Sequence, residues 1–396
     1  MIAAVREPVG PSRHRRPPSS ASHFCAGRSR GAAGGGTTTS AVAIGSREKK
    51  ETMRHVGKTL FAAMVMTAVL LAHGPAARAQ NLEDVFNKIN ASLIVVRSKG
   101  RDINSGGLVH FTETGSGFLI SDTGKVLTAP HVVNGMDEIT VEGIAGEVVR
   151  AKIISSDAAA DIALLQLERV TAAMRVARLG NSDSVRVGQQ VMVVGAPYGL
   201  SYSMSVGWIS ARWPPNTIFR DMPLAEFFQT TATINMGNSG GPMFNTAGEV
   251  IGIVSQNITK SGGSDGLGFA VTINTVEKIL ADRKVFWSAL QGTLLSANLA
   301  ALLNVPAPAG FLIKTVAKDS MAAKVGLTGG DRIVTIGGRD IALGGDVILS
   351  VEGIPIVSEE NIEKVRNKLA GLPSGTPFKI SVLRAGKLIE LTGVAQ

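Results

Sequence analysis

Short apolar runs dominate the chain between about residue 91 and residue 271. They are rich in aliphatic side chains, lie close together, and are separated by turns that contain Gly, Asp and Asn. No long helical period interrupts them, which favours an all-β barrel or sandwich over alternating strand–helix units. The pattern predicts strands at 92–96, 117–120, 162–167, 191–194 and 250–254.

The pattern becomes helical on both sides of this region. One helix is predicted at Leu82–Asn90, before the first strand. A second is predicted at Asn274–Leu290, after the last strand, with Asn274 or Thr275 as its N-cap.

Residues 291–396 form a second module in this interpretation, a mixed α/β unit of about a hundred residues, which is a usual domain size. The strand register within 337–354 stays open. The predicted elements are helices at 296–303, 320–325 and 358–369, and strands at 310–316, 332–336 and 378–384.

The net charge of +9 is confined to the start of the chain, because residues 80–396 contain 28 basic and 28 acidic residues. A neutral body argues against nucleic acid as a partner. Residues 53–79 have a short basic start, an apolar run and the small-x-small sequence Ala77-Arg78-Ala79, which together predict a secretory signal peptide. The apolar run is shorter than the ~18–20 residues of a spanning helix. Contact with the membrane is expected only if this segment stays uncleaved.

Residues 1–52 precede the predicted signal peptide and have no apolar period. We interpret them as the product of a mis-assigned start codon or as a disordered leader. They contain Cys25, the single cysteine of the chain. The exported chain would have no disulfide and no cysteine chemistry, and a bacterial periplasm is the expected compartment.

Three short motifs stand in the order His, Asp, Ser: 126–133 around His131, 161–165 beginning with Asp161, and Gly237-Asn238-Ser239-Gly240-Gly241. A serine hydroxyl is a weak nucleophile, so an imidazole must take its proton during attack and a carboxylate must orient the imidazole. Glycines beside the serine permit a tight turn whose N–H groups point at the developing oxyanion. We therefore predict Ser239 as the nucleophile, His131 as the base and Asp161 as the orienting acid.

Each of these residues has a competing interpretation. His131 could be a hydrogen-bonded core histidine, but His110 is the only other histidine after residue 79 and lies in a polar stretch. Asp157 competes with Asp161, which is favoured because it directly precedes an apolar strand that would shield it. The serine segment also fits the nucleophile elbow of α/β-hydrolases, but that fold needs a later histidine, and none follows the serine.

Further segments point to one family: Gly115-Ser116-Gly117-Phe118, 235–242 and 266–271. With the three motifs, they make the chain similar to chymotrypsin-fold serine peptidases, and specifically to the HtrA/Deg (high-temperature-requirement) family, over 80–396. The resemblance implies an all-β, trypsin-like double barrel at 80–290, with the catalytic residues between two six-stranded barrels. It also implies a small mixed α/β PDZ domain at 291–396.

The resemblance also assigns binding roles. The backbone N–H groups of Gly237 and Ser239, with Asn238 between them, would form the oxyanion hole. Ile234 would line a first pocket for small or medium apolar side chains, and the absence of an acid from 233–236 argues against cleavage after Arg or Lys. The substrate backbone would add as a strand to the segment that contains Gly266, Leu267, Gly268 and Phe269.

In the second module, Ala309-Gly310-Phe311-Leu312 stands where the PDZ family has its carboxylate-binding loop. Such a loop captures a C-terminal carboxylate on backbone N–H groups. An ordinary turn followed by a buried strand is the competing interpretation.

The sequence thus predicts a periplasmic serine endopeptidase that cleaves unfolded or mislocalised polypeptides and whose PDZ domain binds C-terminal tails. No metal or cofactor is expected, and the resemblance implies a homotrimer or a larger homo-oligomer. The alternative is a PDZ-bearing chaperone or binding protein whose barrel is catalytically idle. A third hypothesis is a regulatory peptidase that becomes active only when a specific tail peptide is added.

Overall fold

A computed structural model of the chain describes Met64 and residues 81–104, 106–260, 262–282 and 289–395. The predicted leader and, apart from Met64, the predicted signal peptide lie outside these residues. Within the described part of the chain, no helix combines the length and apolar character needed to cross a bilayer.

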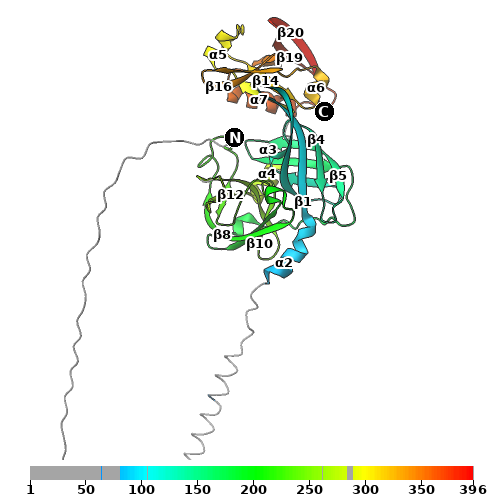
Figure 1. Cartoon of the computed structure of the whole chain (residues 1–396), viewed down its shortest axis with the longest axis vertical. Helices are drawn as coiled ribbons and strands as arrows, with labels where there is room; N and C mark the ends of the chain where they lie inside the picture. Colours follow the sequence, from blue (N-terminus) through cyan, green and yellow to red (C-terminus); the bar gives the residue numbers. More distant parts are fainter. Residues whose placement is uncertain (1–63, 65–80, 105, 261, 283–288, 396) are drawn as a thin grey trace, which may run out of the picture. The chain divides into compact units, whose positions relative to one another are not determined.

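Residues 93–167 form a closed six-stranded antiparallel barrel (Figure 1). Its strand order is β1-β2-β3-β6-β5-β4, and β1 closes it by pairing with β4, for example Val96 with Val141. A short helix, α3 (Pro130–Val133), follows β3. The strands are β1 Leu93–Asn104, β2 Gly107–Leu119, β3 Lys125–Thr128, β4 Met136–Glu142, β5 Val148–Asp157 and β6 Ile162–Leu167.

A second closed six-stranded barrel follows, with the order β10-β11-β12-β9-β8-β7. The fold is therefore the predicted trypsin-like double barrel. All five predicted strands are present, and the strand predicted at 162–167 has the predicted bounds. The strands are β7 Gln190–Gly195, β8 Ser203–Trp213, β9 Phe227–Thr230, β10 Pro242–Asn245, β11 Val250–Asn257 and β12 Gly268–Thr272.

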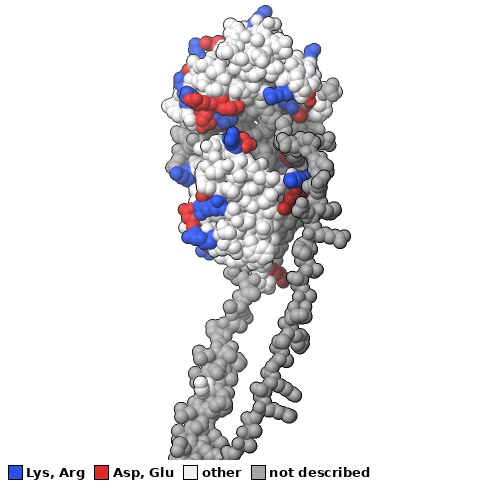
Figure 2. All heavy atoms as spheres, turned by 90° about the vertical axis from the view of Figure 1, so that its left-hand side faces the viewer, with Lys and Arg blue, Asp and Glu red and all other residues white. Residues whose placement is uncertain are grey.

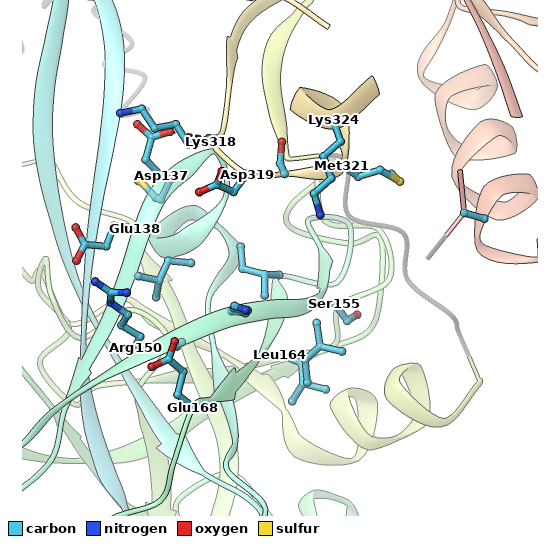
Figure 3. Close-up of a pocket in the computed structure, with 18 of the residues that line it drawn as sticks. Asp137, Glu138, Arg150, Ser155, Leu164, Glu168, Lys318, Asp319, Met321 and Lys324 are labelled. Carbon is cyan, nitrogen blue, oxygen red and sulfur yellow. Dashed lines mark hydrogen bonds between the residues drawn. The ribbon is translucent and has the colours of Figure 1, made fainter. Parts of the chain in front are cut away.

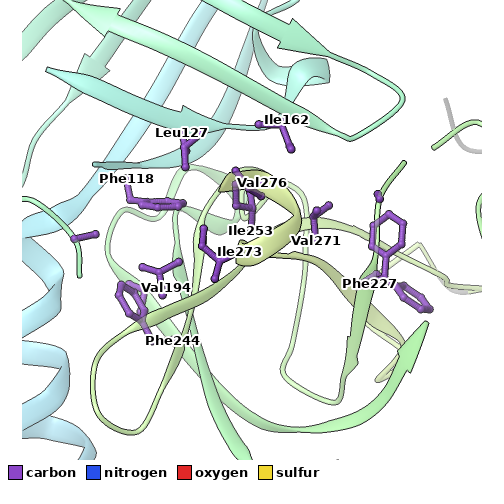
Figure 4. Close-up of a cluster of buried hydrophobic side chains, with 14 of the residues drawn as sticks. Phe118, Leu127, Ile162, Val194, Phe227, Phe244, Ile253, Val271, Ile273 and Val276 are labelled. Atoms are coloured by element: carbon purple, nitrogen blue, oxygen red, sulfur yellow. The ribbon is translucent and has the colours of Figure 1, made fainter. Parts of the chain in front are cut away.

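One apolar core joins the two barrels. Figure 4 shows Phe118 and Leu127 of the first barrel close to Val194 and Ile253 of the second, and all four are buried. Burial of such side chains contributes ~1.5–3 kcal/mol each, so this shared core fixes one barrel against the other. Residues brought from different barrels to this junction can therefore be held in a constant geometry.

The helix α2 (Leu82–Ile89) confirms the prediction before the first strand, and its Val85 and Ile89 are buried. The helix after the second barrel, α4 (Ile273–Asp282), differs from the prediction at both ends. Asn274 lies inside this helix and is not its N-cap. Its Oδ1 accepts a hydrogen bond from the N–H of Ser182 (3.0 Å).

The predicted C-terminal end of that helix is also wrong. Leu290 is the first residue of a strand, β13 (Leu290–Leu294), and pairs with Val316 of β14 (Phe311–Val316). Val316 lies far from Leu290 in the sequence, so the local apolar periodicity could not predict this strand pairing.

The remaining residues form a mixed α/β module whose main sheet has the order β13-β14-β17-β19-β20, with β18 paired to β17 and a separate β15–β16 hairpin. The predicted helices and strands of this module are all present. The other elements are α5 Ala297–Leu302, α6 Met321–Val325, β15 Arg332–Ile336, β16 Arg339–Leu343, β17 Val347–Val351, β18 Ile354–Pro355, α7 Glu359–Ala370, β19 Pro377–Arg384 and β20 Lys387–Val394.

On the face in Figure 2, acidic and basic side chains lie near each other and do not gather into a basic patch. Several form ion pairs, such as Arg97 with Glu142 (2.9 Å) and Arg212 with Glu226 (2.8 Å).

Candidate functional site

The three predicted catalytic residues lie in connections between strands of the two barrels. His131 is in α3, directly after β3, and Asp161 lies between β5 and β6. Ser239 lies between β9 and β10 of the second barrel. His110, the competing histidine, is exposed in the middle of β2.

Asp161 is buried at 7% exposure, as predicted from the apolar strand after it. Its Oδ1 lies 3.8 Å from Nδ1 of His131, whose side chain is half exposed. Its Oδ2 accepts a hydrogen bond from the hydroxyl of Ser255. Asp157 is buried as well, but it ends β5, and its Oδ1 accepts the N–H of Ala159 (3.0 Å).

Ser255 is a site residue that the sequence analysis missed. It is buried in β11, and its carbonyl oxygen accepts the Ser239 hydroxyl at 3.2 Å. One residue therefore contacts both Asp161 and Ser239. Within the described residues, no hydrogen bond joins the Ser239 hydroxyl to His131. The sequence did contain a signal for a role of Ser255. This serine continues an apolar strand, and a hydroxyl that is buried in such a strand requires a hydrogen-bond partner.

The turn before the nucleophile has a defined peptide orientation. The carbonyl of Met236 accepts the N–H of Tyr198 (2.8 Å), and Gly237 has a φ of +98°. Because a trans peptide places N–H and C=O on opposite sides, the N–H of Gly237 points away from Tyr198. A Cβ at Gly237 would overlap the Ala196 carbonyl, so both the backbone conformation and the space require glycine here.

Two N–H groups of this turn remain open. Across the described residues, neither Gly237 nor Ser239 donates its backbone N–H to a protein acceptor. The N–H of Asn238 donates to the carbonyl of Asn235 (3.0 Å), so it is not available to a ligand. Asn238 is buried, and its side-chain Nδ2 donates to the Thr233 carbonyl (3.4 Å).

The comparisons with known proteins agree with this geometry. The trypsin-like peptidase domain family matches residues 115–253, a stretch that contains all three candidate catalytic residues. A probable periplasmic serine endoprotease DegP-like from Pseudomonas savastanoi pv. phaseolicola (strain 1448A / Race 6) is 36% identical over 286 residues, which cover 70% of this chain and 54% of the relative. A protein of the same name from Hahella chejuensis (strain KCTC 2396) is 39% identical over 242 residues, which cover 59% and 50%. Residues 115–253 are therefore a trypsin-like peptidase domain, and the chain is similar to HtrA/Deg serine endoproteases.

Among solved structures, the HtrA-type protease AlgW with decapeptide is 26% identical, with a TM-score of 0.46 and coverage of 79% of this chain and 98% of that chain. The chain spans about half the length of the curated HtrA/Deg relatives that it matches.

The substrate strand that the HtrA/Deg resemblance implies is contradicted for Gly268 and Phe269. Both are in β12, which pairs with β11 on one side and β9 on the other, so neither has a free backbone edge. Phe269 is also buried and makes an edge-to-face contact with Phe219 in the core. Leu267 accepts the N–H of Ile258 through its carbonyl (2.9 Å). Gly266, with a φ of +77°, precedes the strand.

An open edge lies instead on the neighbouring strand. Pairing of β11 with β10 ends at Ile253, and among the described residues no strand pairs with the same side of 255–257. Ile234, the predicted pocket residue, is buried near this edge, and its carbonyl accepts the Nδ2 of Asn257 (3.0 Å). Its side chain packs against Gly268, where a Cβ would lie 2.6 Å from Ile234 Cδ1.

The predicted carboxylate loop of the HtrA/Deg C-terminal module is wrong for the same reason. Phe311 and Leu312 begin β14, which pairs with both β13 and β17, while Ala309 and Gly310 are buried just before it. The carbonyl of Gly310 accepts the N–H of Leu295 (2.8 Å). One edge strand of this sheet is β13, which pairs with β14 alone among the described strands.

A cavity of about 1220 Å³ lies apart from the triad and contains none of its residues. Figure 3 shows Asp137 and Lys318 on one side of it and Arg150 and Glu168 on another. It is lined by β4, β5, α6 and the end of α7.

Asp137 connects the first barrel to the C-terminal module at this cavity. Its carboxylate binds the Arg101 guanidinium (2.5 and 3.0 Å) and accepts the N–H of Lys318 (2.8 Å). Arg101 also donates to the carbonyl of Val316 in β14 (3.1 Å). Burial acts to raise the pKa of Asp137, but the hydrogen bonds from Arg101 and Lys318 outweigh it and hold that pKa below its ordinary value.

Proposed function

We propose that this chain is a serine endopeptidase that cleaves unfolded or mislocalised polypeptides in the bacterial periplasm, with His131, Asp161 and Ser239 as its catalytic triad. The observation that carries the proposal is the position of Ser255, whose hydroxyl donates to Asp161 and whose carbonyl accepts from Ser239. One residue thereby links the acid of the first barrel to the nucleophile of the second. The 3.8 Å separation between Asp161 Oδ1 and His131 Nδ1 supports His131 as the base.

The chemistry follows from these contacts. For catalysis the Ser239 hydroxyl leaves the Ser255 carbonyl and donates to Nε2 of His131, because Nδ1 faces Asp161. The serine oxygen then attacks the substrate carbonyl, and its proton passes to the imidazole. The open N–H groups of Gly237 and Ser239 stabilise the oxyanion. The imidazolium returns the proton to the leaving amine, and water hydrolyses the acyl-enzyme by the same steps.

The substrate would lie as an added strand along residues 255–257, the open edge of β11. Ile234, beside this edge, would limit the first pocket to small or medium apolar side chains. The absence of an acid from 233–236 removes the partner that a Lys or Arg substrate side chain would need.

The C-terminal module, from residue 291, is proposed to be a PDZ domain that binds C-terminal tails along β13. β13 lies at one end of the described main sheet and pairs with β14 alone, so its other edge is open. Leu290 and Leu294 of β13 share an apolar cluster with Val365 and Leu369 of α7, which could hold a terminal apolar side chain. The proposal includes assembly as a homotrimer or a larger homo-oligomer.

Hydrogen exchange measures where a tail binds. We expect a peptide that ends in an apolar residue to slow amide exchange in β13 and α7. The amides of 309–312 should change little, because β14 is already paired on both sides. Slower exchange confined to 309–312 would contradict binding at β13.

An idle barrel is a second candidate function, and a specific contact favours it. The Ser239 hydroxyl donates to Ser255 and not to His131, so the nucleophile is not activated in this arrangement. A binding protein with this barrel would hold tail peptides without cleaving polypeptides.

A fluorophosphonate probe separates the two functions. We expect stoichiometric labelling of the full chain, with the probe mapped to Ser239, and cleavage of casein after small or medium apolar residues. The reaction requires an activated serine and a formed oxyanion hole. A folded protein that binds tail peptides but stays unlabelled, with casein intact, would establish the idle barrel instead.

A further inference from the structure

The segment Gly115-Ser116-Gly117-Phe118 has a place in the site that the triad does not explain. Ser116 lies in β2 of the first barrel and has no exposed surface. Its hydroxyl accepts the N–H of Ala196 (3.0 Å) and donates to the carbonyl of Gly237 (2.7 Å). Both partners belong to the second barrel, so this hydroxyl joins the two barrels directly beside the nucleophile.

The backbone of Ser116 makes two more hydrogen bonds at the same place. Its N–H donates to the carbonyl of Ser239 (2.9 Å), and its carbonyl accepts the hydroxyl of Thr128 (2.7 Å). Thr128 is fully buried and stands three residues before His131. Ser116 therefore makes hydrogen bonds to three parts of the site. They are the strand that precedes His131, Ser239 itself, and the turn that precedes Ser239.

The hydroxyl binds the peptide between Gly237 and Asn238, which lies between the two peptides whose N–H groups would bind the oxyanion. Glycine rotates freely about φ and ψ, so the turn at Gly237 needs external contacts to keep one orientation. The Tyr198 N–H holds the carbonyl of Met236, and the Ser116 hydroxyl holds the next carbonyl, that of Gly237. The bond from Ala196 to the same hydroxyl also fixes the loop that carries Tyr198.

Two glycines of the second barrel lie close to the Ser116 side chain. A Cβ at Gly195 would lie 2.9 Å from the Ser116 hydroxyl, and a Cβ at Gly241 would lie 3.0 Å from its Cβ. The absence of side chains at Gly195 and Gly241 therefore lets the second barrel approach the Ser116 hydroxyl closely.

We propose that Ser116 is a positioning residue that holds the Gly237 turn in the orientation that binds the oxyanion. The inference rests on the proposed peptidase function. It assigns Ser116 no contact with the substrate. Loss of its hydroxyl should affect the transition state, where the oxyanion exists, more than the binding of the substrate.

Ser116→Ala tests this in the full chain. We expect kcat for a peptide substrate to fall by about 10²-fold, because a misplacement of ~1 Å in a site has effects of that order. KM should change less than about threefold. Affinity for a peptide trifluoromethyl ketone, whose adduct with Ser239 carries an oxyanion, should fall in parallel with kcat/KM. Ser116→Cys, which keeps a weak donor, should restore part of kcat and serves if the alanine variant does not fold.

Ser98→Ala is the matched control. Ser98 is also fully buried in the first barrel, in β1, but its hydroxyl has no partner in the described structure. It should leave kcat and inhibitor affinity unchanged. Wild-type kcat in a folded Ser116→Ala protein, or a change in KM alone, would overturn the inference while the peptidase proposal stands. A wild-type protein that neither labels nor cleaves would overturn both.

Discussion

Ser239→Ala should reduce kcat for peptide hydrolysis by about 10⁶-fold and abolish labelling by a fluorophosphonate. Removal of the nucleophile from a triad has effects of this size because the remaining groups cannot form the acyl-enzyme. The alanine loses one hydroxyl, whose hydrogen bond goes to the Ser255 carbonyl, so the fold should stay intact. Casein cleavage, probe labelling and thermal unfolding of the same preparation provide the measurements.

A double variant makes this prediction sharper. Residues of a triad act as a unit, so adding His131→Ala to Ser239→Ala should cause little further loss. His110→Ala is the matched control for the second substitution, because His110 is exposed and lies in a different part of the first barrel. Residual activity within about tenfold of wild type in Ser239→Ala would place the nucleophile at another residue.

Asp161→Asn should reduce kcat by about 10⁴-fold, the scale of tautomer loss in a triad. The Ser255 hydroxyl donates to Oδ2 of Asp161, so an asparagine would turn its oxygen to Ser255 and its NH₂ to His131. Nδ1 of His131 would then have to accept a hydrogen bond, and Nε2 would carry the proton. In that tautomer the imidazole cannot take the proton of Ser239, although the shape of the site is preserved.

Asp157→Asn provides the comparison, since Asp157 is equally buried but its Oδ1 accepts the N–H of Ala159. Asparagine can keep that bond, so kcat should stay within about tenfold of wild type even if stability falls. Steady-state kinetics of both variants, with circular dichroism to verify folding, measure the difference. Equal losses in the two variants would remove the special role assigned to Asp161.

The all-β class of residues 91–271 was predictable because each strand has its own local apolar pattern, whereas the double barrel was implied by the resemblance to the HtrA/Deg family. The aliphatic runs at 162–167 and 191–194 are strands in the structure, and the turns between runs are loops. The burial of Asp161 also follows from one local fact, the apolar strand that begins after it.

The errors arose where pairing across the chain decides the outcome. The segments at 266–269 and 309–312 resemble binding edges, but β12 and β14 each have two neighbouring strands. Which strand of a sheet lies at its edge depends on partners distant in sequence. Ser255 was missed for the same reason, because its role depends on the hydrogen bond that its hydroxyl donates to Asp161 of the other barrel.

The open side of residues 255–257 has a consequence for the choice of substrate. A polypeptide can lie there only if several of its own amides and carbonyls are unsatisfied at once. In native domains nearly all backbone N–H and C=O groups are hydrogen-bonded within the domain, and the few strand edges that remain are shielded. Damage that exposes a stretch of main chain would thus be sufficient to create a substrate. Residues 255–257 could then bind proteins that have no sequence in common.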